Sequence, residues 1–376
     1  MCIVLLTTAH PSYALIVIDN RDEFILRPTS RPHWWTALAS RQPSRTSTPQ
    51  PAANAKANGN GLAPNEEEVQ HILSSRDLQR SERGTWLGVT RSGHFAVLTN
   101  YRETNTHDAS HPIHGTRSRG GMVTAWLGSS SKESVKDFVS GMLADGGCKH
   151  VGGFSLICGK LRKQTSGNGK GEKNLEPLAI LSNRSDTADQ VPWIAKERGE
   201  VHGLSNTSFD DPATWPKVEA GKRMLTEVIE EAKTKEFTED QLRDKLFSIL
   251  DQDTLPVSPD TSFEEYIAVL KQSIFIPAIG DEDHRLAMEK ATAQGIPQPQ
   301  WQDAMQEVRG EERPDEQTAG FGTGMYGTQR QTILLVDWDG NVTYTERALW
   351  DSNGNPVERG KGDMTFKFEI AGWNDS

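Results

Sequence analysis

The sequence is poor in cysteine. Its 376 residues include only three: Cys2, Cys148 and Cys158. So few cysteines in so long a chain do not make a disulfide framework, and no C-x-x-C pair is present for a zinc site. The sequence therefore indicates a reducing compartment.

Long apolar runs and targeting signals are also missing. No stretch approaches the roughly 20 apolar residues of a membrane-spanning helix. The opening MCIVLLTTAHPSY has no basic region, and acidic residues follow soon after it, so neither a signal peptide nor a cleaved mitochondrial presequence is predicted. The chain has no phosphate-binding loop, dinucleotide fingerprint or serine nucleophile elbow either.

The composition points to a soluble, acidic chain. Hydrophobic residues make up 35% of it, and the mean hydropathy is -0.61. The formal net charge of -11 argues against broad binding to nucleic acid or anionic membranes, because attraction to phosphate needs clustered lysine and arginine. Together with the cysteine count, this predicts a cytoplasmic protein without a nucleic-acid partner.

Strand-like runs open and close the chain. Residues Ile3–Thr7 and Ala14–Ile18 are separated by the short turn AHPS, which predicts a hairpin. Residues 84–90 and 94–100 predict a second hairpin. Further strands are expected at residues 152–161, 175–184, 201–206, 331–338, 342–350 and 363–370.

Helices are predicted mostly in the middle of the chain. Capping boxes at Ser130/Glu133 and Thr238/Gln241 predict helix starts, the first for a helix over 130–143. Residues 215–233 and 262–272 are further helix candidates. Because strands come first, helices dominate mid-chain and strands return, we expect mostly antiparallel sheets covered by helices, an α+β layered fold.

Three segments hold too little apolar surface to offset the entropy of ordering. They are residues 39–68, 162–174 and 293–325, which are rich in serine, proline, glycine and polar residues. We expect them to be disordered insertions in a single domain over residues 1–376.

Cys2 is the first candidate for chemistry. Removal of Met1 is usual before a small residue, and it would leave a cysteine that carries its own α-amine. The amine titrates near ~7.7–8 and a thiol near ~8.5, so the amine can accept the thiol proton. The thiolate is a nucleophile or a soft ligand. Alternatively, Cys2 is a small packing residue at the start of a strand.

A charged cluster, Asp19–Glu23, follows the second apolar run. If the first two strands form a hairpin, this cluster returns to the point where the chain begins. Arg21 could then hold a thiolate or an anionic ligand, Asp22 could hold the α-amine, and Asn20 could fix either. The alternative is a solvated turn with surface ion pairs, since such residues commonly make turns.

Two asparagines end later strands in a similar way. Asn100 closes VLTN and Asn206 closes GLSN. Side-chain amides at strand ends suit oxyanion stabilisation or ligand recognition. Local turns stabilised by the asparagine side chains are the alternative.

Three histidines, His107, His111 and His114, lie close together in HDASHPIHG. Their spacing could hold a metal or a haem iron. The segment is polar and contains a proline, so an ordinary loop is the favoured interpretation, and no metal site is predicted.

Several blocks resemble one known family. MCIVLL, NRDEF with a following RP, GTWLGV, LTNYR, SRG, GLSN with a following WPK, and YGTQRQTILLVD occur in this order along almost the whole chain. Together they are similar to the NRDE family, also called the transport and Golgi organisation protein 2 family. The insertions fall between the blocks.

The resemblance implies a distant relationship to the N-terminal nucleophile hydrolases, particularly the cysteine branch of choloylglycine hydrolase and penicillin V acylase. It implies an αββα four-layer sandwich with Cys2 at the start of a central strand. In that branch an arginine and an aspartate follow the nucleophile, as Arg21 and Asp22 do, and two asparagines frame the reacting carbonyl, as Asn100 and Asn206 would. A late arginine of the branch has its nearest counterpart in Arg330.

The resemblance also implies cellular roles. Family members are linked to Golgi organisation and protein secretion, to acyl-CoA and lipid homeostasis, and to haem trafficking, in the cytosol, in mitochondria and at Golgi membranes. The favoured hypothesis is a protein that binds a small hydrophobic anion, such as an acyl-CoA or haem, and requires no cofactor. The alternatives are an N-terminal-cysteine amidohydrolase or thioesterase, and a Golgi-associated scaffold.

The binding hypothesis assigns anion recognition to the arginines and apolar contact to Trp34, Trp35 or Trp86. In the hydrolase hypothesis, Cys2 attacks while Arg21, Asp22, Asn100 and Asn206 assist. The predicted ligand-binding residues are Cys2, Asn20, Arg21, Asp22, Glu23, Arg27, Trp34, Trp86, Asn100, Arg102, Asn206 and Arg330.

Overall fold

The computed structural model describes most of the chain. The described ranges are 2–39, 68–101, 118–144, 146–165, 173–210, 215–256, 265–266, 269–294 and 324–374. Arg102 and the three clustered histidines lie outside them. So do most residues of the predicted insertions at 39–68 and 293–325, and residues 166–172 of the insertion at 162–174.

A six-stranded antiparallel sheet contains the first and the last of the described strands. Its strand order is β12-β1-β2-β13-β14-β15. The strands are β1 (Ile3–Thr7), β2 (Tyr13–Phe24), β12 (Val201–Leu204), β13 (Tyr326–Asp337), β14 (Asn341–Ala348) and β15 (Asp363–Glu369). The predicted β1–β2 hairpin is confirmed, with Ile3 paired to Asn20 and Thr7 to Ile16.

A seven-stranded antiparallel sheet packs against the first, in the order β11-β10-β7-β6-β5-β4-β3. Its strands are β3 (His33–Leu38), β4 (Val69–Ser74), β5 (Leu87–Thr90), β6 (His94–Asn100), β7 (Phe154–Lys160), β10 (Leu178–Ser182) and β11 (Trp193–Ile194). A small ribbon of β8 (Lys163–Thr165) and β9 (Lys173–Leu175) pairs the two flanks of the predicted insertion at 162–174.

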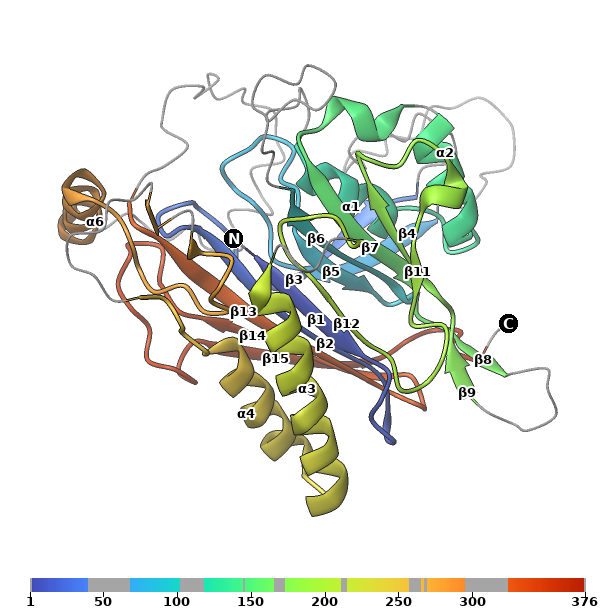
Figure 1. The fold of residues 1–376 in the computed structure, drawn as a ribbon. Coiled ribbons are helices and arrows are strands. Elements are labelled where there is room, and N and C mark those ends of the chain that lie inside the picture. Colours follow the sequence, from blue (N-terminus) through green and yellow to red (C-terminus); the bar gives the residue numbers. More distant parts are fainter. Residues whose placement is uncertain are drawn as a thin grey trace.

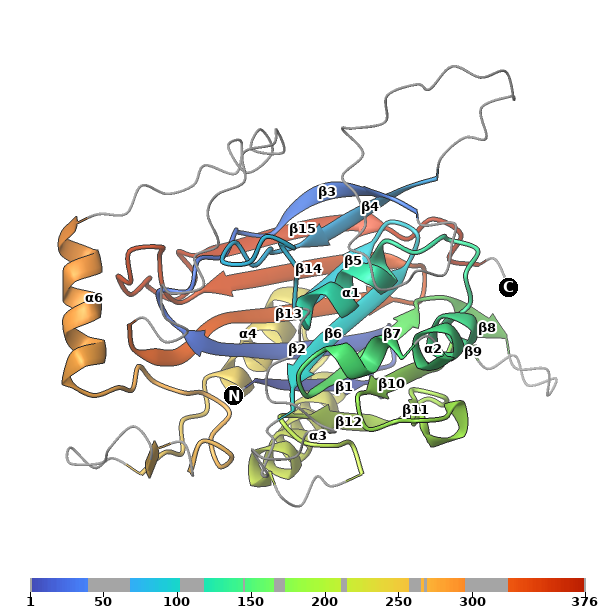
Figure 2. The same ribbon diagram turned by 90° about the horizontal axis from the view of Figure 1, so that it is seen from above.

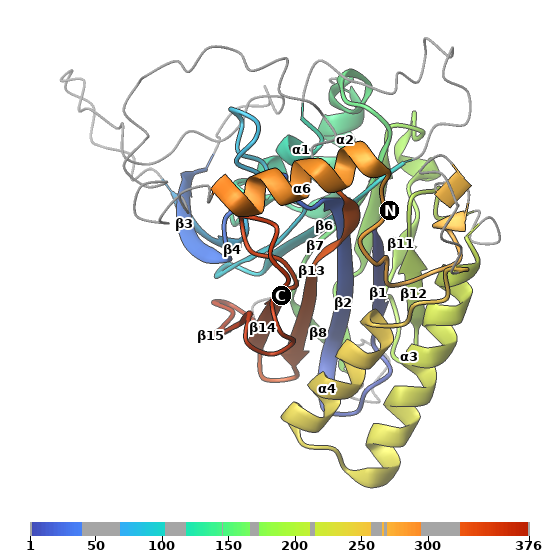
Figure 3. The ribbon, with the colours of Figure 1, turned by 90° about the vertical axis from the view of Figure 1, so that its left-hand side faces the viewer.

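Helices cover the outer faces of the two sheets (Figure 1). The described helices are α1 (Gly120–Leu127), α2 (Val135–Ala144), α3 (Pro216–Lys235), α4 (Glu239–Leu250) and α6 (Glu282–Gln294), with short 3-10 turns η2 (Gly147–His150) and η3 (Ala188–Gln190). Helices α3 and α4 share a core with the six-stranded sheet, and α1 and α2 share one with the seven-stranded sheet. Helix α6 lies at one end of the sandwich, away from the other helices (Figure 2), and Figure 3 shows it in front of the strand ends. Its His284 ring stacks on Phe24 of β2.

The layer order confirms the predicted αββα four-layer sandwich. A third apolar core lies between the sheets and contains residues such as Val4, Val17, Phe95 and Val97. Both sheets are therefore buried on two faces. This is why their central strands are apolar runs rather than strict alternations.

Of the two predicted capping boxes, one is confirmed and the other is wrong. Thr238 does cap α4, since its hydroxyl accepts from the Gln241 amide while the Gln241 side chain returns to the Thr238 amide. The helix expected over 130–143 instead begins at Val135, where Ser134 accepts from the Asp137 amide. Ser130 lies in a turn instead, where the Glu133 amide donates to its carbonyl oxygen and its hydroxyl donates to Glu68.

Candidate functional site

Strand β2 continues straight through the charged cluster, so the solvated-turn interpretation is wrong. Its side chains alternate between two buried faces. Val17 belongs to the inter-sheet core and Ile18 to the helix-covered core. Asp19 and Arg21 therefore lie on the inter-sheet face, whereas Asn20 and Asp22 lie on the helix-covered face.

Cys2 lies beside this cluster. Because Ile3 pairs with Asn20, continuing the register by one residue sets Cys2 opposite Arg21. The Cys2 Sγ donates to the backbone oxygen of Asp22 at 3.7 Å, and the residue is partly exposed. The strand start and the charged cluster thus meet, as the hairpin predicted.

The two predicted asparagines reach the same place. The Ser205 hydroxyl donates to the Cys2 carbonyl oxygen at 2.6 Å. The next residue, Asn206, donates its side-chain amide to the Asn100 carbonyl oxygen at 2.6 Å. These contacts join β12 to β1 and to the end of β6, and so bring Asn100 and Asn206 to the neighbourhood of Cys2.

Arg21 is clamped from both sheets. Its guanidinium lies over the ring of Trp86, 4.3 Å from the centroid, and donates to the side-chain oxygen of Gln329. A bulge in β13 between Thr328 and Arg330 makes this contact, because the extra residue Gln329 can turn its side chain toward Arg21. The stacking on Trp86 adds a favourable cation–π contact across the layer.

A buried ionic network continues along the inter-sheet face. Arg330 pairs with Arg21 in register, and its Nε lies 3.8 Å from the Glu346 Oε1. Glu346 is fully buried and accepts from the Ser75 hydroxyl at 2.6 Å, while Arg31 approaches it at 3.7 Å. Burial lowers the pKa of Arg330 to about 10, and Glu346 opposes that shift.

Asp19 is a buried carboxylate on this face. It is 2% exposed, and its Oδ2 has no hydrogen-bond partner among the described residues. Burial raises the pKa of Asp19 well above its usual range, Asp22 adds to the rise, and Arg21 opposes it.

The helix-covered face is arranged differently. The Asn20 amide donates to the carbonyl oxygens of Leu250 and Ile274 at 2.8 and 3.0 Å. The Asp22 carboxylate accepts from the Thr328 hydroxyl at 2.7 Å and lies 4.0 Å from the Nζ of Lys217. Asn20 and the Asp22 side chain, both predicted to contact a ligand, thus point toward the helix layer.

Further charged side chains lie near Arg119, which is itself within electrostatic range of Cys2. Arg27 pairs with Glu23 at 3.4 Å and with Asp77 at 2.6 Å. Arg119 donates to the Gly153 carbonyl oxygen at 3.3 Å. Burial lowers the pKa of Arg119; Glu23 opposes this, while Arg80 and Arg27 lower it further. Several guanidinium groups are thus crowded within electrostatic range of one another.

The Cys2 thiol is held in its protonated form. Burial raises the pKa of Cys2 to about 11; the chain's amino group opposes this shift, and Asp22 and Asp19 add to it. A thiol of this kind is a weak nucleophile near neutral pH.

Trp34 and Trp35 lie elsewhere. Trp34 packs edge-on against Phe368 of β15, under the guanidinium of Arg91, at the far edge of both sheets. Trp35 turns to the opposite face and joins the core under α1 and α2. Of the three predicted tryptophans, Trp86 is the one that contacts the charged cluster.

The structure adds residues that the sequence analysis did not single out: Arg119, Ser205, Lys217, Gln329 and Glu346. Two had a readable signal. Glu346 alternates with Val342 and Tyr344 in a strand-like run, which places a carboxylate on an apolar face. Lys217 follows Trp-Pro at the start of a predicted helix. The Gln329 contact had no signal, because it depends on the bulge.

Within the described part of the chain, no three histidine, cysteine or acidic side chains are grouped so as to bind a metal ion. None of the described helices is both long and apolar enough to cross a bilayer.

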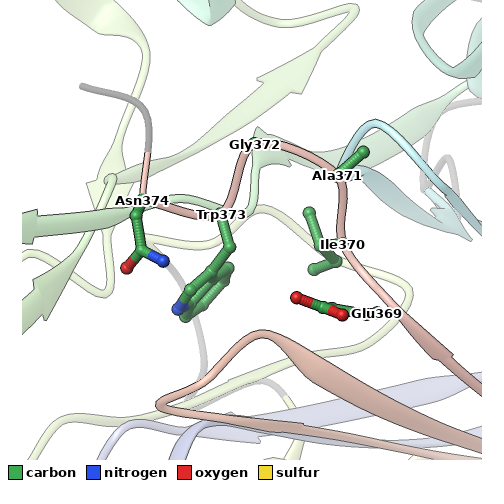
Figure 4. A pocket seen from close by; sticks show the side chains of 6 residues that line it. All are labelled: Glu369, Ile370, Ala371, Gly372, Trp373 and Asn374. Carbon is green, nitrogen blue, oxygen red and sulfur yellow. The ribbon is translucent and has the colours of Figure 1, made fainter.

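A separate hollow of about 450 Å³ lies at the C-terminal turn (Figure 4). Its wall includes Trp373, whose indole N–H donates to the Trp338 carbonyl oxygen, and Asn374, which accepts from Lys163. It contains none of the predicted site residues. Its lining residues are Glu369, Ile370, Ala371, Gly372, Trp373 and Asn374.

Comparison with known proteins identifies the family. The family described as Transport and Golgi organisation 2 matches residues 1–45 and 60–351. The chain belongs to this family. The Transport and Golgi organisation 2 match covers every described residue of the candidate site, from Cys2 to Glu346.

Curated relatives of the Transport and Golgi organisation 2 family match along most of their length. The Transport and Golgi organization protein 2 homolog of Bos taurus is 25% identical over 344 residues, covering 91% of this chain and 89% of the relative. The Homo sapiens homolog is 26% identical with the same coverage.

Similar solved structures include penicillin V acylase from Agrobacterium tumefaciens, with 10% identity and a TM-score of 0.33 over 98% of this chain and 86% of that one. A mutant conjugated bile acid hydrolase from Clostridium perfringens has 10% identity and a TM-score of 0.32 over 100% and 98% of the two chains.

Proposed function

We propose that this chain binds a small anionic ligand with an apolar portion at the end of the sandwich around Cys2, Arg21 and Trp86. Acyl-CoA and haem are the candidate ligands, in keeping with a role in lipid homeostasis, haem trafficking or secretory-pathway organisation. Membership of the Transport and Golgi organisation 2 family supports this proposal, and so does the chemistry of the site.

The crowding of arginines beside Cys2 carries the proposal. The whole chain has a formal net charge of -11, yet Arg21, Arg27, Arg80 and Arg119 gather at this end. Bringing partly buried guanidinium groups together is unfavourable unless anions accompany them. Glu23 and Asp77 supply part of that charge through Arg27. An anionic ligand would supply more.

Trp86 provides the apolar contact. Its half-buried ring packs against the inter-sheet core on one side and under the Arg21 guanidinium on the other. The part of the Trp86 side chain that stays exposed, next to a fixed cation, suits a ligand with both an apolar body and a negative group, as in most small-molecule sites. Asn100 and Cys2 are partly exposed nearby and offer polar contacts.

Binding of palmitoyl-CoA and of haemin to the full-length chain, measured by calorimetry and absorbance titration, tests the proposal. We expect saturable binding of one of them, and a loss of about tenfold or more in affinity for Arg21→Gln, because a charge-assisted contact contributes about 1.5–3 kcal/mol. Arg119→Gln should weaken binding in the same direction.

Arg91→Gln is the matched control. Arg91 also stacks on a tryptophan, Trp34, with its guanidinium 4.4 Å from the ring, but at the far edge of the sheets. The ligand affinity of the Arg91→Gln variant should equal that of the unmodified chain. If Arg91→Gln and Arg21→Gln weaken binding equally, or if neither ligand binds, the proposal fails.

A hydrolase that uses Cys2 is the second candidate. The adjacency of Cys2, Ser205, Asn206 and Asn100 favours it, because amides near a nucleophile can stabilise an oxyanion. The raised pKa of the thiol disfavours it, and so does the Asp22 carboxylate, which faces the helix layer. Binding is therefore the better-supported function.

Two measurements separate these candidates. Intact-mass analysis that shows Met1 retained would remove the α-amine base and with it the hydrolase. If Met1 is removed, amide and thioester substrates should be screened with Cys2→Ser as the inactive control. Turnover that disappears in Cys2→Ser, while ligand affinity is kept, would establish the hydrolase.

A further inference from the structure

A lysine is buried under the candidate site. Lys217 lies in the first turn of α3, directly after Pro216, and its side chain is fully buried. Its Nζ lies 4.0 Å from the Oδ2 of Asp22, whose side chain is also fully buried. Lysine is seldom fully buried unless it is paired, because removing an ammonium group from water is costly.

Asp22 connects this ammonium group to the thiol. Its carboxylate accepts from Thr328 at 2.7 Å and faces Lys217. Its backbone oxygen accepts from the Cys2 Sγ at 3.7 Å and from the Tyr326 hydroxyl at 3.2 Å. A change in the charge or position of the Asp22 side chain is therefore transmitted to the peptide that holds Cys2.

We propose that Lys217 is a positioning residue for Cys2, which fixes and neutralises Asp22 so that the thiol is held beside a balanced pair of charges. This role goes beyond ligand binding, because the state of the thiol can be measured without any ligand. The proposed role of Lys217 also differs from that of the inter-sheet arginines, because those arginines lie on the other face of β2.

The groups that act on Cys2 come from several elements. Asp19 and Asp22 of β2 disfavour the thiolate, and the chain's amino group favours it. Lys217 from α3 and Arg119, which precedes α1, lie within electrostatic range of the thiol, as does Tyr326 of β13. Without Lys217, the negative charge of Asp22 would act more strongly on the thiol.

Alkylation of Cys2 by iodoacetamide provides the test. The rate is followed by peptide mass spectrometry across about pH 7–10, which separates Cys2 from the buried Cys148 and Cys158. We expect Lys217→Met to alkylate about three- to tenfold more slowly, as for a thiol pKa raised by about half to one unit. Asp22→Asn should react faster by a similar factor, and Lys217→Met/Asp22→Asn should return close to the unmodified rate.

Opposite effects of the two single variants distinguish this role from mere packing. If Lys217 and Asp22 only held the structure together, both single variants would open the site and react faster. That result, or an unchanged rate in Lys217→Met, overturns the proposal. Lys222→Met is the control, because Lys222 lies on the same helix, partly exposed and paired with Glu219. If Lys217→Met does not fold, Asp22→Asn must still react faster than the double variant.

Discussion

Asn20 and Asp22 face the helix layer, where the Asn20 amide donates to two carbonyl oxygens and the Asp22 carboxylate accepts from a hydroxyl. The Asn20 Oδ1 has no hydrogen-bond partner among the described residues, but both side chains are fixed by neutral groups at ordinary distances. Asp19 and Arg21, on the other face of the same strand, belong to a buried ionic layer in which two carboxylate oxygens, Asp19 Oδ2 and Glu346 Oε1, have no hydrogen-bond partner among the described residues. The same strand therefore anchors the helix layer with one face and carries a network of buried charged side chains on the other. Perturbed charges of this kind are concentrated at functional sites.

The largest effect should come from breaking the inter-sheet network. Glu346→Ala leaves Arg330 buried without its carboxylate and removes the acceptor of Ser75. Because an uncompensated buried charge is costly, we expect a loss of about 3–5 kcal/mol in the free energy of unfolding. Urea denaturation measures it, and a loss below about 1 kcal/mol would show that the network is not structural.

Asn20→Ala probes the helix-covered face. The substitution leaves the buried carbonyl oxygens of Leu250 and Ile274 without the Asn20 amide. Since each unsatisfied buried group costs about 1–3 kcal/mol, we expect a loss of about 2–4 kcal/mol in the same assay. Asn341→Ala, at the exposed start of β14 where the side-chain amide donates to Asp337, serves as the control and should change stability much less.

Asp19→Asn should stabilise the protein at neutral pH. The folded-state pKa of Asp19 is raised above its usual range. Its contribution to stability is therefore fully present below the ordinary carboxyl pKa and is lost as pH rises through the raised value. We expect a gain of about 1–3 kcal/mol at pH 8, which shrinks as the pH falls toward about 4. Thermal unfolding across pH measures this; a gain independent of pH would contradict the assignment.

The smallest effect is expected at an exposed ion pair. Lys367 of β15 lies 2.7 Å from Glu239 of α4, and its side chain is 67% exposed. Lys367→Ala should change the free energy of unfolding by less than about 1 kcal/mol, and added salt should reduce the effect further. A larger change would mean that surface charge also holds the helices to this sheet.

Sequence reasoning predicted the parts of the site that depend on local patterns. The AHPS turn and two apolar runs predicted the hairpin that sets Cys2 beside Arg21, and this pairing is confirmed. The strand-end pattern singled out Asn100 and Asn206, which the structure joins near Cys2. The charged run itself was ambiguous, because Asp19–Glu23 matches the composition of a turn although the chain there is extended.

Contacts between residues distant in sequence decided the features that the sequence did not predict. Trp34 and Trp86 are similar as isolated residues, and only the strand order places Trp86 over Arg21 and Trp34 near Phe368. The chain at Ser130 forms a turn in place of the predicted capping box, and Glu68, distant in sequence, accepts from both the Ser130 hydroxyl and the Ser131 amide there. Local propensity does not include such competing partners.

The sequence by itself determined the periodicity of the strands, the capped start of α4 and the pairing of the first hairpin, because these depend on residues close along the chain. Only the tertiary structure decided which face of β2 each charge occupies and which distant groups it meets. Three residues that contact the cluster lie 195 or more positions after Asp22 in the sequence: Lys217, Gln329 and Glu346. Lys217 acts on Asp22 and Cys2, and Glu346 acts on Arg330, through charges that burial removes from the screening of water. Gln329 acts on Arg21 through a hydrogen bond.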